Sequence, residues 1–245
     1  MLSYQHAYHA GNRADIQKHS LLCSVLEILT RKERPLTYME THAGRGVYDL
    51  TSPQAQKTGE AEEGWLSLDK TAIEKLPAKY VEAVKNLNGG GLSPLYPGSP
   101  CVAAYILRKQ DQLHLMELHP QEHAALEKVF AQDDRVHIHK RDGLEGVMAL
   151  SPPEPRKGIV LVDPSYELKD EYETIPAFVV KLAQKWPEAC ILVWVPMLRA
   201  GRHEGMVEKL KSSFPGLKIF KTEWKNPGEG LCGSIMAGVN LPFGV

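Results

Sequence analysis

The chain has 245 residues, of which 43% are hydrophobic, and its formal net charge is −1. This size and apolar content predict one large α/β domain or two small ones, and they exclude a chain that is disordered throughout. The balanced charge excludes a protein that coats nucleic acid non-specifically, although it allows a local basic groove.

The first segment in chain order, MLSYQHAYHAGNRAD, is polar and unlike a signal peptide. No later apolar stretch reaches the ~20 residues that span a membrane. The four cysteines lie far apart and form no Cys-x-x-Cys pair, so free thiols are expected in place of a disulfide framework. We therefore expect a soluble protein in the cytoplasm.

Short apolar runs alternate with longer amphipathic segments along the chain. Seven runs are expected to be strands: 36–42, 113–118, 136–140, 158–162, 190–195, 217–223 and 234–240. Helical spacing of apolar residues predicts helices that include 14–29, 120–130, 170–185 and 203–212. This alternation is typical of βαβ units, so we predict an α/β fold with a mainly parallel, doubly wound sheet.

The region 49–96 interrupts this alternation, because it shows no convincing strand. It contains one expected helix, 71–88, which ends in Asn88 and three glycines, and it closes with the turn-rich run SPLYPGSP. We interpret 49–96 as a small helical subdomain inserted after the first strand. The remaining residues, 1–48 and 97–245, would form the sheet domain.

Open parallel sheets bind ligands outside the carboxyl ends of their strands, and four such ends are unusual here. The first carries Glu40, followed by Gly44 and Gly46. Glycines allow a tight turn close to a ligand, and the amides that follow can bind it. An ordinary strand-to-helix turn would look the same in the sequence.

The second and third strand ends also carry acids. Glu117 is placed to accept both hydroxyls of a ribose, although the insertion separates it from the glycines by more than the usual ~20 residues. Asp142 and Gly143 could bind an adenine edge through a carboxylate and an amide. A helix N-cap at Asp142 is an equally good interpretation.

The fourth strand ends in Asp163, Pro164, Ser165 and Tyr166. Pro164 has no amide hydrogen and ends the strand, so Asp163 and the Pro164 carbonyl should project together at the sheet edge. Two acceptors that bind an exocyclic amine would localise its lone pair, and an aromatic face would stack on the base. One acceptor could also take the proton. A polar turn with a helix cap is the alternative.

Together these motifs resemble the class I S-adenosylmethionine-dependent amino methyltransferases. More narrowly, MLSYQHAYHAGNRADIQKH, THAGRGVYDL, YPGSP, ELHP and DPSYE are similar to the RlmJ family over nearly the whole chain. The resemblance implies a Rossmann-like fold with an inserted helical subdomain. It also implies methyl transfer from S-adenosyl-L-methionine to an adenine N6 of large-subunit ribosomal RNA, naked or partly assembled, without a metal or a stable protein partner.

The resemblance also implies roles for individual residues. Tyr4 and His6 match an N-terminal tail that folds over the active site and helps to hold the target base. Lys18 would pair with the methionine carboxylate. The full set of implied cofactor contacts is Lys18, His19, His42, Ser99, Glu117, Asp142, Gly143 and Asp163.

Two positions depart from the family pattern. Ser165 stands where the family has a second proline, which should loosen the turn without removing a reacting group. At 240–243 the chain reads Asn-Leu-Pro-Phe in place of an Asn-Pro-Pro-Trp-like strand end that leads into a further tail.

Three other interpretations remain. His119 and His123 match an H-x-x-E-H zinc pattern, but Pro120 fits the first position of a helix and would put His119 at its cap. The substrate could be DNA adenine in place of RNA. Finally, a nucleic-acid-binding protein linked to the use of external DNA would show no methyl transfer and no uptake of the cofactor.

Overall fold

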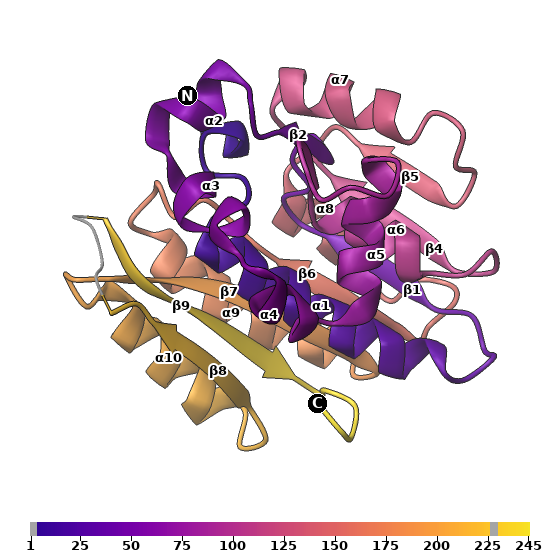
Figure 1. Ribbon diagram of the computed structural model, residues 1–245. Coiled ribbons are helices and arrows are strands. Elements are labelled where there is room, and N and C mark those ends of the chain that lie inside the picture. The colour runs from indigo at the N-terminus through magenta and orange to yellow at the C-terminus, as the bar shows by residue number, and fades with distance from the viewer. Residues whose placement is uncertain (1–3, 226–229) are drawn as a thin grey trace.

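The computed structural model describes residues 4–225 and 230–245, and its centre is a seven-stranded sheet (Figure 1). The strand order is β5-β4-β1-β6-β7-β9-β8. All seven expected strands are present: β1 (Thr37–Glu40), β4 (Gln112–Met116), β5 (Val136–His139), β6 (Gly158–Val162), β7 (Ala189–Leu198), β8 (Lys218–Glu223) and β9 (Leu231–Val239). Five neighbouring strands, β5 to β7, run parallel, whereas β9 is antiparallel to both β7 and β8. The prediction of a mainly parallel sheet is confirmed.

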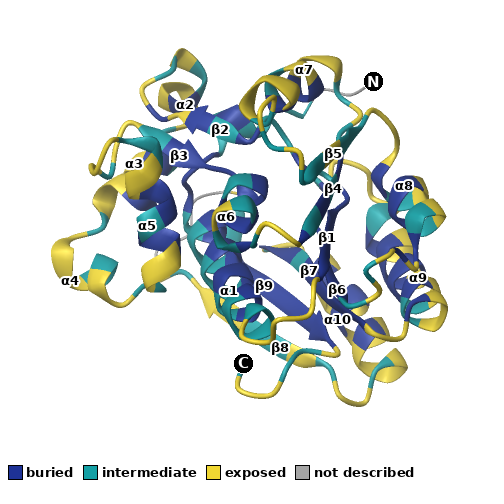
Figure 2. Cartoon of the chain, turned by 90° about the vertical axis from the view of Figure 1, so that its right-hand side faces the viewer, coloured by how far each residue is buried: buried dark blue, intermediate teal, exposed yellow. Residues whose placement is uncertain are grey.

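Helices cover both faces of the sheet. Hydrophobic side chains of α1 (Arg13–Thr30), α6 (Ser99–Ile106) and α7 (Pro120–Val129) join the core on one face. Those of α8 (Gly143–Leu150), α9 (Glu171–Lys185) and α10 (Arg202–Ser213) join the core on the other. Figure 2 shows the resulting buried strands between helices with exposed outer surfaces. Every residue of β6 is buried, as expected for a strand covered on both sides.

The centre of the sheet places several of the unusual strand ends together. β1 pairs with both β4 and β6, so the direction of strand order reverses between β1 and β6. Such a reversal opens a crevice at the carboxyl ends of the strands. Glu40 lies opposite Leu161 in this register, and Asp163 follows two residues later. The predicted acids of the first and fourth strand ends are therefore neighbours.

The region after β1 differs from the prediction in two ways. Two short strands, β2 (Val47–Asp49) and β3 (Leu95–Pro97), lie at the two ends of this region and pair with each other in antiparallel orientation. The expected single helix 71–88 is instead two helices, because Pro77 is the N-cap of the second. The segment between the strands contains α2 (Pro53–Thr58), α3 (Glu60–Glu63), the 3-10 turn η2 (Trp65–Ser67), α4 (Lys70–Glu74) and α5 (Ala78–Leu87).

This inserted segment has its own aromatic core, which is shared with the sheet domain. Trp65, Tyr80 and Tyr96 are buried together with Cys23 of α1 and Val102 of α6. The Trp65 indole donates a hydrogen bond to the Leu92 carbonyl at 2.8 Å. Because residues of α1 and α6 complete this core, the segment is packed against these two helices of the sheet domain. Its status as a separate domain stays a prediction.

Within the described ranges, every helix falls short of the length and apolarity that a membrane crossing requires.

Candidate active site

Asp163 stands at the carboxyl end of β6 and is bound to Lys18. The strand ends at Val162, and the Asp163 amide donates to the Thr41 hydroxyl at 3.4 Å. The Lys18 ammonium donates to Oδ2 of Asp163 at 2.6 Å. The two side chains are 6% and 13% exposed, so this is a nearly buried ion pair. The structure therefore joins the first helix to the Asp-Pro turn through a contact between Lys18 and Asp163 that the sequence did not predict.

Lys18 also binds Asp15, a residue that was not among the predicted site residues. Its ammonium lies 2.9 Å from Oδ1 of Asp15, one turn back on α1. Burial lowers the pKa of Lys18, but Asp15 and Asp163 outweigh burial and raise it well above its ordinary value. Burial raises the pKa of Asp15, but His6 and Lys18 outweigh burial and hold it well below its ordinary value. The ammonium and the Asp15 carboxylate are therefore both charged at neutral pH.

The predicted tail residues continue this chain of contacts. His6 Nε2 lies 2.9 Å from Oδ2 of Asp15, and His6 Nδ1 lies 2.9 Å from the Tyr4 hydroxyl. Burial, followed by the nearby Asp163 charge, raises the pKa of Tyr4 far above its ordinary value. A continuous set of polar contacts thus runs from Tyr4 through His6, Asp15 and Lys18 to Asp163.

The glycine turn after β1 is held by Glu117. One carboxylate oxygen accepts the Gly44 amide at 2.8 Å and the other accepts the His119 amide at 2.7 Å. Gly44 and Gly46 have φ values of +63° and +82°, which L residues rarely adopt. A Cβ on Gly44 would also lie 2.3 Å from the Tyr48 hydroxyl oxygen. The first and second predicted strand ends therefore meet in one backbone cradle.

Glu40 is fully buried at the end of β1, four residues before Gly44. It accepts hydrogen bonds from the Tyr38 hydroxyl at 2.7 Å and from the Ser99 hydroxyl. Burial raises the pKa of Glu40 to about 8, so the neutral acid is the main form at pH 7. Ser99, predicted as a cofactor contact, directs its hydroxyl at Glu40.

The third strand end meets the first. Asp142 caps α8, and its Oδ1 accepts the Glu145 amide at 2.9 Å, so the helix-cap interpretation is correct for that oxygen. Gly143 lies against the end of β1, since a Cβ there would be 1.8 Å from the Thr41 carbonyl oxygen. His42 Nδ1 lies 2.8 Å from the Thr41 hydroxyl, and burial lowers the pKa of His42. Gly143 and His42 therefore both contact Thr41, at the same edge as Asp163.

The His19 side chain makes its described hydrogen bond and ring contacts with the inserted segment. It is 1% exposed, its Nδ1 lies 3.2 Å from the Tyr96 hydroxyl, and its ring meets Tyr80 edge-on. Burial lowers the pKa of His19 to about 3. The described contacts of His19 are thus with the aromatic core of the inserted segment.

Tyr166 completes the fourth strand end in a left-handed conformation, with φ at 55°. Such a conformation is uncommon for a bulky residue, and strained residues of this kind cluster at active sites, ligand clamps and switch regions. Its hydroxyl donates to the Trp194 carbonyl at 2.6 Å, and its ring packs against Tyr172 with centroids 4.9 Å apart. Only 9% of Tyr166 is exposed, so its contacts hold the turn and leave little of the ring open.

The histidine pair of the zinc pattern has other partners. His119 is the N-cap of α7 with Pro120 in the first turn, as the sequence predicted. The Glu122 carboxylate binds Arg45 of the glycine turn, at 2.9 Å to its Nε, and His123 lies 3.4 Å from Glu127. In residues 4–225 and 230–245, no group of three or more histidine, cysteine or acidic side chains is placed to hold a metal ion.

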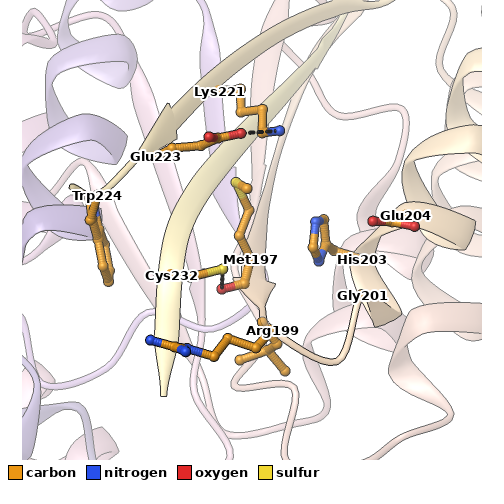
Figure 3. Close-up of a pocket in the computed structure, with 10 residues that line it drawn as sticks. Met197, Arg199, Gly201, His203, Glu204, Lys221, Glu223, Trp224 and Cys232 are labelled. Atoms are coloured by element: carbon orange, nitrogen blue, oxygen red, sulfur yellow. Dashed lines mark hydrogen bonds and ion pairs between the residues drawn. The ribbon is translucent and has the colours of Figure 1, made fainter. Parts of the chain in front are cut away.

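A cavity of about 390 Å³ lies at the carboxyl end of β7, beside α10. Figure 3 shows Lys221 directed at Glu223, with which it forms an ion pair, and the sulfur-containing side chains of Met197 and Cys232 between the other lining residues. None of the predicted site residues lines this cavity. It is therefore not part of the cluster around Asp163.

The sheet order, the glycine turn and the acid at the end of β6 define a class of protein, the Rossmann-like α/β proteins with a ligand crevice at the carboxyl ends of their strands. A Bacillus cereus O-methyltransferase, solved in complex with SAH, has this fold. It superposes with a TM-score of 0.51 at 13% identity, over 96% of this chain and 86% of that one.

The family follows from closer relatives. The family model described as ribosomal RNA large subunit methyltransferase D, RlmJ, matches residues 33–245. Ribosomal RNA large subunit methyltransferase J of Escherichia coli (strain K12) is 37% identical over 251 residues, which is 99% of this chain and 88% of the relative. A crystal structure of a Legionella pneumophila protein superposes with a TM-score of 0.86 at 35% identity, over 96% of this chain and 88% of that one. The chain belongs to the RlmJ family and is a methyltransferase, so the resemblance is confirmed and the non-methylating alternative is set aside.

Proposed function

We propose that this protein transfers a methyl group from S-adenosyl-L-methionine to N6 of an adenine in large-subunit ribosomal RNA. The observation that carries the proposal is the Asp163 carboxylate, fixed at the end of β6 by the Lys18 ammonium 2.6 Å away. Lys18 occupies Oδ2, so Oδ1 and the Pro164 carbonyl are the two acceptors for the N–H bonds of the target amine. Binding by two acceptors would concentrate the amine lone pair on nitrogen for attack.

The residues present fit the cofactor. The Glu117 carboxylate uses one lone pair on each oxygen for the Gly44 and His119 amides, which leaves further lone pairs for two ribose hydroxyls. Asp142 uses Oδ1 to cap α8, so Oδ2 remains for an adenine amine next to the Gly143 amide. S-adenosyl-L-methionine supplies an activated sulfonium methyl group when bound.

The protein's own contribution is alignment and the handling of one proton. Tyr4 and His6 are connected to the Lys18–Asp163 pair through Asp15, and they are proposed to hold the flipped base. The target base must leave its stack to reach such a site, which favours single-stranded or partly assembled RNA as the substrate. Tyr166 is proposed to contact the base with the small part of its ring that the turn leaves open.

The remaining predicted cofactor contacts also bind other groups of the protein itself. Lys18 already binds two carboxylates, so a methionine carboxylate would be its third anion. Ser99 and Glu40 bind each other, and we propose that they support the glycine turn from below. His42 stays a proposed cofactor contact through its position at the end of β1. The described contacts of His19 favour a structural role.

Methyl transfer with a radiolabelled cofactor tests this proposal. Protein-free large-subunit RNA, assembled large subunits and duplex DNA are supplied separately, and the labelled nucleoside is identified after nuclease digestion. We expect N6-methyladenosine from protein-free RNA, little label from assembled subunits, and no label with the Asp163→Ala variant. Label found only in DNA would select the DNA alternative, and a different methylated nucleoside would overturn the N6 assignment.

A further inference from the structure

The inserted helical segment binds the N-terminal tail, which is the stretch 4–12 before α1, through Glu60, the first residue of α3. One carboxylate oxygen of Glu60 lies 2.7 Å from His9 Nδ1, and the other accepts the Asn12 side-chain amide at 2.9 Å. Neither contact was expected from the sequence, since about fifty residues separate the partners. Glu60 thus bonds to two tail residues at once.

The same face of the inserted segment carries further contacts to the tail. The Trp65 amide donates to the Gly11 carbonyl at 2.8 Å, and the Thr58 hydroxyl donates to the Tyr8 carbonyl. The two backbones touch at Gly64, because a Cβ there would lie 2.1 Å from the Gly11 oxygen. The tail therefore rests directly on α2, α3 and η2.

Two chains of contacts lead from Glu60 to the ion pair of Lys18 and Asp163. His9 stacks on Tyr4 with ring centroids 5.5 Å apart and planes 4° from parallel, and Tyr4 binds His6. Asn12, the N-cap of α1, accepts the Asp15 amide at 2.8 Å. Both routes converge on Asp15, which binds His6 and Lys18. One carboxylate in the insertion thus orients both sides of the network that ends at Asp163.

We infer that Glu60 is a positioning residue for methyl transfer, and this inference rests on the proposed function. It does not contact the reacting groups. The Glu60 carboxylate accepts from the Asn12 amide, and its hydrogen bond to the His9 ring raises the pKa of His9 above the ordinary value, so its charge favours the protonated ring. A glutamine at position 60 can still accept from the Asn12 amide, but it carries no charge, so the charge-assisted hydrogen bond that favours the protonated His9 ring is lost.

Glu60→Gln tests the inference, with Glu62→Gln as the matched control on the same helix. Glu62 is exposed on α3, whereas Glu60 and His9 are each 35% exposed, so neither change should unfold the protein. We expect kcat to fall about tenfold in Glu60→Gln, since small misplacements near reacting groups cost that much or more. The melting temperature and the rate of Glu62→Gln should stay at wild-type values.

Hydrogen exchange supplies a readout that needs no substrate. The amides of Tyr8, His9 and Asn12 are bonded within the tail, to the carbonyls of residues 5, 6 and 9 respectively. They should exchange faster in Glu60→Gln than in Glu62→Gln, while the amides in the middle of α1 stay protected. Equal exchange in the two variants would show that Glu60 does not hold the tail.

A double-variant cycle with His6→Ala separates positioning from a general loss of structure. If Glu60 acts through His6, Glu60→Gln should have little further effect on kcat in the His6→Ala background. A full additional loss in the double variant would assign the effect of Glu60 to the Asn12 route, which bypasses His6. An unchanged rate in the single variant overturns the inference while leaving the proposed function in place. If the wild type itself methylates no RNA, the proposed function fails, and the exchange comparison still decides whether Glu60 holds the tail.

Discussion

The Nζ atom of Lys18 lies 2.6 Å from Oδ2 of Asp163, and the 2.9 Å contact with Asp15 places the same ammonium between two carboxylates. Lys18 is 6% exposed and Asp15 is 2% exposed at the side chain, so little water is present to screen the carboxylates from each other. The cation is therefore required both to hold Asp163 in position and to keep two nearby negative charges in the folded protein.

Lys18→Met should lose methyl transfer and also destabilise the fold. Removal of one partner from a buried ion pair costs about 3–5 kcal/mol, because the remaining charge is left without compensation. Urea unfolding at pH 7 measures this loss. The double variant Lys18→Met/Asp15→Asn also removes one of the two buried negative charges that Lys18 compensates. It should therefore be more stable than Lys18→Met alone while staying inactive. A single variant with wild-type stability would contradict the buried-cation account.

Much of the site was predictable because its signals are local. Five consecutive apolar residues followed by Asp163 and Pro164 specify a buried strand and its end, and the structure has both. Gly44 and Gly46 mark a turn by residue type alone, and both have a positive φ. His119 at the cap of α7 follows from the proline after it. In each case, neighbours in the sequence contain the physical reason for the structure.

The remaining features depend on contacts between distant segments or on signals too short to read. β2 and β3 have three residues each, which is too few for an alternation pattern to stand out. Pro77 did carry a signal for the break between α4 and α5. Asp15 stands at helical spacing from Lys18, but an acid in a first helical turn is common for other reasons. The two partners of Glu60, His9 and Asn12, could not be predicted from the sequence, because about fifty residues separate them from it.

Gly143→Ala should destabilise the protein at the junction of α8 and β1. The new Cβ would lie 1.8 Å from the Thr41 carbonyl oxygen, which belongs to backbone and cannot rotate away. Overpacking of this kind costs about 1–3 kcal/mol. Gly205→Ala is the control, because no described atom outside its chain neighbours and the adjacent backbone of α10 lies within 4 Å of its Cβ position. That helical substitution should stabilise by about 0.5–1 kcal/mol. Denaturant unfolding of both variants tests the contrast, and a Gly143→Ala protein as stable as wild type would show that the close approach is absent.

Ser165→Pro should preserve activity and stabilise the turn. Ser165 is not among the described non-glycine residues with positive φ, which are Tyr166 and Asn240, so a proline meets no left-handed backbone there. A compatible proline stabilises by about 0.4–1 kcal/mol, chiefly because it restricts the unfolded chain. The melting temperature should rise, and the methyl-transfer rate should stay within about threefold, since no proposed reacting group changes. Ser165→Ala, which leaves the backbone free, should not raise the melting temperature. A large loss of activity in Ser165→Pro would mean that the serine hydroxyl or its backbone freedom takes part in the reaction.

The buried His19 should lower the free energy of unfolding as the pH falls. Burial lowers its pKa from 6.5 to about 3 in the folded protein, so the fold holds the neutral ring while the unfolded chain takes up a proton below pH 6.5. The stability associated with neutral His19 is therefore fully present above pH 6.5 and is lost progressively as the pH falls toward 3. Between pH 7 and pH 5 this one group should lower the free energy of unfolding by about 2 kcal/mol. His19→Gln keeps a group that can bond to the Tyr96 hydroxyl but cannot take up a proton in this range. Urea unfolding at both pH values should therefore show a smaller loss for His19→Gln than for the wild type. Parallel losses in the two proteins would place the acid sensitivity in other groups.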